Sequence, residues 1–171
     1  MGIKVKLCKN LETINKCCEL VVSSFDESEK SCYNDSRFIV AKESLRNLDM
    51  LKADLLLRLV EANTISIIGV YFNDKLHGCF AVNATNNRIL FFAVLNGENN
   101  MRIAEFLLSY LLHYFKKPDD DSSFRIIAFA GSVPFFRKLG FVQGKKTPIE
   151  DNNILVMPMT YSFGQFDNQF S

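Results

Sequence analysis

The chain has 171 residues, of which 48% are hydrophobic, so it can bury one sizeable core and is too short for two ordinary domains. Its 20 Lys and Arg residues nearly balance 19 Asp and Glu residues, which excludes a strong overall field toward nucleic acid or anionic membranes. Five cysteines match neither a disulfide framework nor a zinc spacing, and no apolar run approaches ~20 residues, so we expect a cytoplasmic or nuclear protein without a metal site or membrane partner.

The first third of the chain predicts one strand and two helices. Apolar and basic residues alternate through residues 3–7, which predicts a half-buried strand. Apolar side chains recur at helical spacing through residues 11–25, and the polar run 26–35 that follows predicts a mobile loop. Leucines at intervals of three or four residues then predict a single second helix with one buried face within residues 40–60.

The middle of the chain predicts an antiparallel meander. Residues 64–72 are β-branched and aromatic, and a polar turn leads into a second run at residues 76–83, which together predict a hairpin. Residues 88–95 are almost continuously apolar, which is typical of a strand covered on both faces. We therefore place this third strand at the centre of a sheet.

The last third predicts two helices and two strands. Apolar residues at helical spacing predict a long helix over 101–115, and residues 124–130 predict a buried strand. A Ser-Val-Pro start and a closing glycine predict a short helix over 135–139. A final strand is expected over 154–161. This order predicts one α/β (α+β) domain with a mixed sheet up to residue 161, followed by a tail over 162–171.

The segment Val-Pro-Phe-Phe-Arg-Lys-Leu-Gly-Phe at residues 133–141 resembles the F-Y-x-K-x-G-F segment that closes GNAT-fold N-acyltransferases. An ordinary amphipathic helix ending in glycine is the alternative reading of this motif alone. Residues 88–111 are further similar to the central strand, pyrophosphate loop and long helix of PCAF-type histone acetyltransferases, and the similarity covers residues 63–161.

This resemblance implies a GNAT fold, with a mostly antiparallel sheet flanked by helices, and acetyl-CoA as the cofactor. In that family the central strand splays from its neighbour, so that its main chain can bind the pantetheine arm as an added strand would. The matching residues predict a coenzyme site that consists of Ala93, Val94, Leu95, Asn99, Asn100, Met101, Arg102, Ile103, Ala104, Ser132, Phe135, Phe136 and Lys138.

The pyrophosphate loop departs from the family pattern, because Asn99 matches it only approximately and Arg102 replaces a glycine. Asn99 to Ala104 match Gln/Arg-x-x-Gly-x-Gly/Ala at a helix N-terminus, where free N–H groups hold phosphate. Arg102 stands where glycine normally lets the backbone approach closely. Either its guanidinium supplies a phosphate contact that offsets this loss, or the site has decayed.

The catalytic groups of the family are also replaced. Arg88 aligns with a carboxylate that acts as general base in the PCAF branch, and Phe135 and Phe136 occupy the pair that often contains an acidic tyrosine. His77 and Tyr161 are the candidate replacements, as base and acid, although a histidine beside a turn and a tyrosine at a strand end are more often structural.

Two functions compete on this basis. The first is an acetyl-CoA-dependent N-acetyltransferase acting on a protein lysine, a protein N-terminus or a small amine. The second is a catalytically inactive GNAT-like module that binds a protein partner, suggested by Arg88 and Arg102. The sequence carries no motif for the acceptor or for the oligomeric state.

Overall fold

The computed structural model describes residues 2–117 and 123–163. In these ranges one sheet has the strand order β1-β2-β3-β4-β5-β8-β6, and β7 pairs with β8 outside this path. The strands are β1 (Ile3–Leu7), β2 (Ser66–Phe72), β3 (Lys75–Asn83), β4 (Arg88–Val94), β5 (Ser123–Phe129), β6 (Val142–Gln143), β7 (Ile149–Asp151) and β8 (Ile154–Ser162). The helices are α1 (Leu11–Glu29), α2 (Asp35–Arg46), α3 (Ala53–Glu61), α4 (Asn100–Phe115) and α5 (Val133–Leu139), with 3₁₀ turns η1 (Lys30–Cys32), η2 (Asp49–Leu51) and η3 (Ala130–Ser132).

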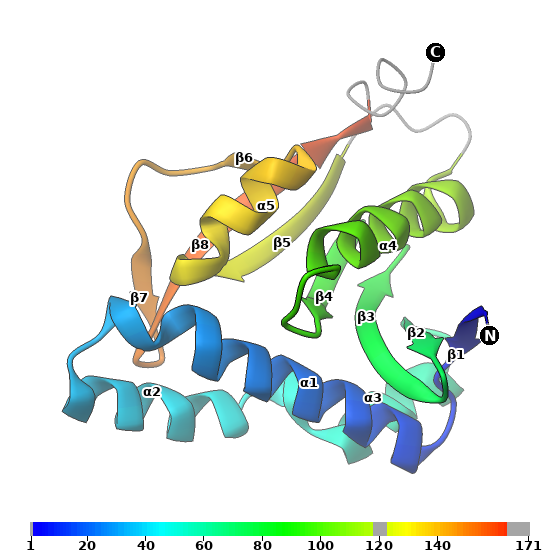
Figure 1. Cartoon of the computed structure of the whole chain (residues 1–171), viewed down its shortest axis with the longest axis horizontal. Helices are drawn as coiled ribbons and strands as arrows, with labels where there is room; N and C mark the ends of the chain where they lie inside the picture. The colour runs from blue at the N-terminus through cyan, green and yellow to red at the C-terminus, as the bar shows by residue number, and fades with distance from the viewer. Residues whose placement is uncertain (1, 118–122, 164–171) are drawn as a thin grey trace.

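Helices cover both faces of this sheet (Figure 1). Helices α1, α2 and α3 lie along one face, and α4 and α5 lie along the other. Strand β4 contributes Ile89 and Phe92 to the core under α4 and α5, and Phe91 and Ala93 to the core over α1. The prediction of a central strand with two covered faces is therefore confirmed.

The sheet is antiparallel except where β4 meets β5. These two strands are parallel, and their pairing is limited to Arg88 opposite Arg125 and Ile89 opposite Ile126. Beyond Ile89 the two strands diverge, while β3 stays paired with β4 as far as Val94. The result is a V-shaped opening in the middle of the sheet, between β4 and β5 (Figure 1).

The predicted hairpin has its expected turn. Asn73 and Asp74 have φ angles of 51° and 61°, which are the left-handed values that a two-residue hairpin turn requires. The long helix lies where periodicity predicted it. The short helix ends as predicted, at Gly140 with φ 105°, and begins two residues before the predicted start, at Val133. The mixed, mostly antiparallel sheet with helices on both faces agrees with the predicted fold class.

The prediction of a mobile loop over residues 26–35 was wrong. Helix α1 continues to Glu29, η1 follows, and the Asn34 side chain caps α2 by accepting the Arg37 N–H at 2.9 Å. The polar residues of this segment occupy the outer faces of helices, and only their hydrophobic neighbours carry the pattern that periodicity detects. Glu29 is the exception, because its side chain is fully buried.

The prediction of a single helix over residues 40–60 was also wrong. Helix α2 ends at Arg46, and Leu48 has the extended angles φ −68° and ψ 136°, so the chain turns before η2 and α3 begin. Leucine spacing continued across the break because both helices face the same core. Periodicity alone could not locate the break.

Smaller differences concern the ends of the sheet. Strand β1 is an exposed edge rather than half-buried, with Ile3 and Leu7 50% and 54% exposed. Strands β6 and β7 were not predicted, and they have two and three residues.

Within the predicted tail, Phe163 is buried against Phe124 at a ring distance of 5.1 Å, and residues 164–171 lie outside the described residues. No helix in the described ranges has the length and apolar character needed to cross a membrane.

Candidate functional site

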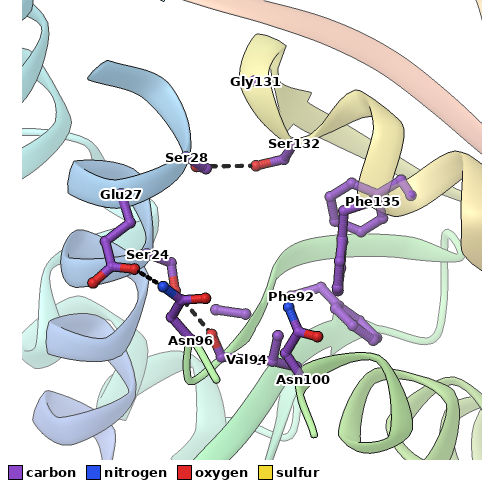
Figure 2. Close-up of a pocket in the computed structure, with 12 residues that line it drawn as sticks. Ser24, Glu27, Ser28, Phe92, Val94, Asn96, Asn100, Gly131, Ser132 and Phe135 are labelled. Carbon is purple, nitrogen blue, oxygen red and sulfur yellow. Dashed lines mark hydrogen bonds between the residues drawn. The ribbon is translucent and has the colours of Figure 1, made fainter. Parts of the chain in front are cut away.

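Where β4 diverges from β5, a cavity of about 260 Å³ lies against the end of β4 (Figure 2). Three further segments complete its walls, namely the second half of α1, the start of α4, and η3 with α5. The lining residues are Ser24, Glu27, Ser28, Phe92, Ala93, Val94, Asn96, Asn100, Gly131, Ser132, Phe135 and Phe136.

The main chain of β4 is only partly used by its neighbours. Leu95 N–H donates to His77 O of β3 at 2.7 Å. Because alternate residues of an antiparallel pair point their main-chain groups in opposite directions, Val94 points its N–H and C=O away from β3 and toward the opening. The Val94 carbonyl accepts the Ser24 hydroxyl at 3.1 Å, and its N–H has no acceptor among the described residues. Val94 thus offers a free donor, whereas the predicted N–H contact from Leu95 is already taken by β3.

The N-terminus of α4 forms another side of the cavity, through Asn100. Two of its first amides are bonded locally, Asn100 N to Gly97 O at 3.3 Å and Ile103 N to Asn99 O at 3.0 Å. The amides of Met101 and Arg102 have no acceptor in the described part of the chain. They form the positive end of a 16-residue helix, which is a suitable place for an anion.

The other predicted residues of this loop differ in their surroundings. Arg102 is exposed, and Ala104 is fully buried in the core. A Cβ placed on Gly78 of β3 would lie 2.8 Å from Ile103 Cγ2, so Ile103 packs tightly on the sheet. Ile103 and Ala104 therefore anchor the helix. The Met101 and Arg102 amides and the cavity residue Asn100 remain for a ligand, and the Arg102 side chain is not among the residues that line the cavity.

Helix α5 supplies the aromatic wall. Phe136 packs edge-on against Phe92 at a ring distance of 5.9 Å, and Phe135 packs against Phe136 at 5.2 Å. Ser132 precedes this helix and also lines the cavity, whereas Lys138 is exposed on its last turn and does not. Ser132 and both phenylalanines therefore line the same cavity as Val94, and Lys138 does not.

The α1 wall was missed by the sequence predictions. Ser24, Glu27 and Ser28 face the cavity, and the Glu27 carboxylate accepts a hydrogen bond from the Asn96 side chain across its edge (Figure 2). A signal was available, since Ser24 and Ser28 are four residues apart and continue the helical register of residues 11–25 on one face. The polar composition of the segment concealed this continuation.

Glu29 lies immediately behind this wall and bridges α1 to η3. Its Oε1 accepts the Gly131 N–H at 2.5 Å, and its Oε2 accepts the hydroxyls of Ser28 at 2.5 Å and Ser132 at 3.1 Å. Burial raises the pKa of Glu29, and the three hydrogen bonds partly offset this rise. The approach is close because Gly131 has no side chain, and a Cβ there would lie 2.2 Å from Ser28 O.

The two predicted catalytic residues lie away from the cavity. Tyr161 is fully buried and contacts the Phe141 ring at 5.4 Å, and burial raises the pKa of its phenol. It pairs with Phe124 at the closed end of the V, because β8 runs antiparallel to β5. The sequence showed a strand end but not which end of the sheet it reached. His77 is a residue of β3, with its ring 5.8 Å from the Phe72 ring, and it does not line the cavity.

Arg88, which aligns with the family's carboxylate, also lies at the closed end. It pairs with Arg125, six residues before Val94, which corresponds to about 20 Å along an extended strand. Its positive charge is therefore remote from the opening.

Residues 28–163 match the family described as the acetyltransferase (GNAT) domain. The chain belongs to the GNAT acetyltransferase family. No curated protein matches the sequence. The GNAT fold also recurs in solved structures of low identity, which support the fold alone.

The PaiA N-acetyltransferase from Thermoplasma acidophilum, solved with coenzyme A, is 17% identical, with a TM-score of 0.67 over 95% of this chain and 99% of that one. The aminoglycoside 6′-N-acetyltransferase from Enterococcus faecium is 13% identical, with a TM-score of 0.56 over 95% and 97%. The spermidine/spermine N-acetyltransferase SpeG from Vibrio cholerae is 12% identical, with a TM-score of 0.55 over 99% and 100%. The GNAT family membership and the coenzyme A complex agree with acetyl-CoA as the co-substrate.

Proposed function

We propose that this GNAT protein is an acetyl-CoA-dependent N-acetyltransferase that acts on an amine. The divergence of β4 from β5 carries this proposal, because it leaves the Val94 N–H free beside a cavity that α1 and α5 enclose. An inactive member would have no need to keep this opening. Closing it would require only that the two strands stay paired beyond Ile89.

Each wall of the cavity fits one part of acetyl-CoA. The free amides of α4 and the Arg102 guanidinium suit the pyrophosphate, since both offer donors to an anion. The Val94 N–H suits the amide groups of the pantetheine arm or the thioester carbonyl, as an added strand would use it. Phe135 and Phe136 provide an apolar wall that excludes water.

The α1 wall suits the acceptor. When bound, acetyl-CoA supplies an activated acetyl group, and transfer requires an amine that has lost its proton. The Glu27 carboxylate at the cavity can hold a protonated amine and accept that proton, directly or through water. The narrow opening orients the amine, which by positioning alone can lower the barrier by several kcal/mol.

Two kinds of similarity, to solved structures and to a sequence family, suggest which amines to test as acceptors. The similar structures include enzymes named for aminoglycoside and spermidine acetylation, and the sequence resemblance to PCAF-type enzymes suggests a protein lysine. A small polyamine, an aminoglycoside and a lysine peptide are therefore the acceptors to compare. The cytoplasmic or nuclear location predicted from the cysteines is compatible with each of them.

Calorimetric titration with acetyl-CoA tests the coenzyme site. We expect a dissociation constant in the micromolar range, comparable to ordinary enzyme substrates. Replacing Arg102→Glu should weaken binding about tenfold or more, because a charge-assisted contact is lost and the new charge repels phosphate. Lys9→Glu, the same charge change at an exposed residue between β1 and α1 instead of in the first turn of α4, is the matched control.

The same titration distinguishes the alternative of an inactive, protein-binding GNAT module. Arg88 in place of the family's carboxylate and Arg102 in place of glycine favour that alternative. Absence of any heat with acetyl-CoA, from protein that is folded by circular dichroism, would support it and end the enzymatic proposal. Binding followed by turnover on any of the three acceptors supports the N-acetyltransferase.

A further inference from the structure

The departing coenzyme leaves as a thiolate and needs a proton, yet the aromatic pair on α5 has no hydroxyl. Phe135 and Phe136 line the cavity, and Tyr161 lies at the closed end of the V. Three serines do line the cavity, and the Ser24 hydroxyl already donates to Val94 O. The other two, Ser28 on α1 and Ser132 before α5, lie on facing walls with their oxygens 3.3 Å apart (Figure 2). Both contact the same carboxyl oxygen of Glu29.

We propose that Ser132 protonates the leaving sulfur and is reprotonated by Glu29, whose Oε2 is 3.1 Å from the Ser132 hydroxyl. In this step the Ser132 hydroxyl turns toward the cavity, and a protonated Oε2 donates to the Ser132 oxygen instead of accepting from it. This inference rests on the proposed N-acetyltransferase activity. Ser132 is the catalytic residue in this scheme because it lines the cavity. Glu29 is a positioning residue that also stores the proton, and Ser28 holds Glu29 Oε2 at 2.5 Å.

The surroundings of Glu29 favour its neutral form. Its side chain is fully buried, and no Lys or Arg of the described residues forms an ion pair with it. The titratable groups that face it are Cys32 and Tyr33, from η1 and the residue after it. Burial is the main cause of the raised pKa of both groups, and the nearby Glu29 carboxyl adds to it. From the facing elements η3 and α5 it meets the Gly131 amide and the Ser132 hydroxyl. Ionising Glu29 is therefore opposed by burial and aided only by neutral donors.

The proton count of the step balances. The nitrogen of a neutral amine forms a bond to the acetyl carbon, and the carbon–sulfur bond breaks. The sulfur takes the Ser132 proton while Ser132 takes the Glu29 proton. The surplus proton of the new amide nitrogen passes to Glu27 or to water, and Glu29 regains a proton from solvent. The products are an amide and a free thiol.

The test compares Ser132→Ala, Ser132→Thr and Glu29→Gln with wild type, by kcat as a function of pH and by coenzyme affinity. We expect Ser132→Ala to lower kcat about 10²-fold, which is typical for loss of a general acid. Its coenzyme dissociation constant should change by less than about threefold, because the contact forms only during transfer. Ser132→Thr should restore most of kcat, because threonine keeps the hydroxyl.

The pH profile and an infrared measurement separate proton storage from a structural role for Glu29. The wild-type kcat should fall as pH rises through the Glu29 pKa, and Glu29→Gln should lower kcat and remove this fall. Wild type should also show the infrared band of a protonated buried carboxyl, and Glu29→Gln should lack it. The exposed residues Ser23 and Glu19 of the same helix provide the controls Ser23→Ala and Glu19→Gln, which should match wild type.

Two results would overturn the relay. One is a Ser132→Ala variant with wild-type kcat and pH profile, in an enzyme that does transfer acetyl groups; the proposed function would then stand without the relay. The other is the absence of a protonated carboxyl band at any pH where the enzyme works. A wild-type protein that transfers no acetyl group to any acceptor would instead remove the proposed function together with the relay.

Discussion

Gly131 lies where η3 passes closest to α1, and its missing side chain makes this approach possible. A Cβ there would be 2.2 Å from Ser28 O and 2.7 Å from Glu29 Oε2, and the first of these is a backbone atom that cannot move aside cheaply. We predict that Gly131→Ala lowers the free energy of unfolding by about 1–3 kcal/mol, as overpacking does. The melting temperature should fall by roughly 2–4 °C for each kcal/mol.

Gly2→Ala is the control for this substitution, because a Cβ at Gly2 would meet nothing within 4 Å. Gly131→Ala should also weaken acetyl-CoA binding, since Gly131 and Ser132 share one wall of the cavity. A Gly131→Ala protein with the wild-type melting temperature would show that α1 and η3 are not held as closely as described.

Helix α4 is positioned by its leucine stripe, which packs on β3 and β4. Leu107 is fully buried, and its neighbour Phe106 is 38% exposed, so the two residues compare a buried position with an exposed one on the same helix. We predict that Leu107→Ala costs about 2–5 kcal/mol of unfolding free energy, through lost burial and a residual cavity. Phe106→Ala should cost much less, and chemical denaturation of both variants measures the difference.

The packing of α4 on β3 also determines where the N-terminus of α4 lies at the cavity. The Leu107 Cδ1 and Ile103 Cγ2 atoms would each lie 2.8 Å from a Cβ on Gly78, so the glycine lets α4 sit directly on β3. This contact sets the position of the α4 N-terminus relative to Val94. Equal costs for Leu107→Ala and Phe106→Ala would contradict the assignment of the stripe to the core.

The stability of the whole molecule should depend on pH through Glu29. The pKa of Glu29 in the folded chain is raised above the ordinary value of 4.5. At a pH between 4.5 and the folded-state pKa, the folded chain therefore binds more protons than the unfolded chain. The free energy of unfolding contributed by Glu29 should therefore fall as pH rises above about 4.5, by at most about 1.4 kcal/mol per pH unit, and then level off.

Denaturation of wild type and Glu29→Gln across this pH range isolates the effect, because glutamine does not titrate. The stability advantage of wild type over Glu29→Gln should be largest at low pH and shrink as pH rises. Glu19→Gln, an exposed change on the same helix, should stay parallel to wild type. An advantage that grows with pH would mean that Glu29 is ionised in the folded protein.

Local pattern was sufficient for most of the fold. β-branched, aromatic and continuously apolar runs located β2, β3 and β4, and a period of 3.6 residues located α4, each to within a few residues, because these segments bury one face or two against a core. The motif at residues 133–141 pointed to the GNAT family, which the family match confirms. The secondary-structure elements and the motif depend on residues close together in the chain, so the sequence is enough to predict them.

The site depended on contacts between residues far apart in the chain. Glu29 and Ser132 meet across 103 positions, and the opening beside Val94 exists because β4 and β5 pair only at Arg88 and Ile89. Tyr161 is far from this opening because β8 runs antiparallel to β5. The Leu95 N–H is bonded to His77 O because of the register between Leu95 and β3. Strand direction, register and the docking of α1 are set by packing of the whole chain, and no local pattern encodes them.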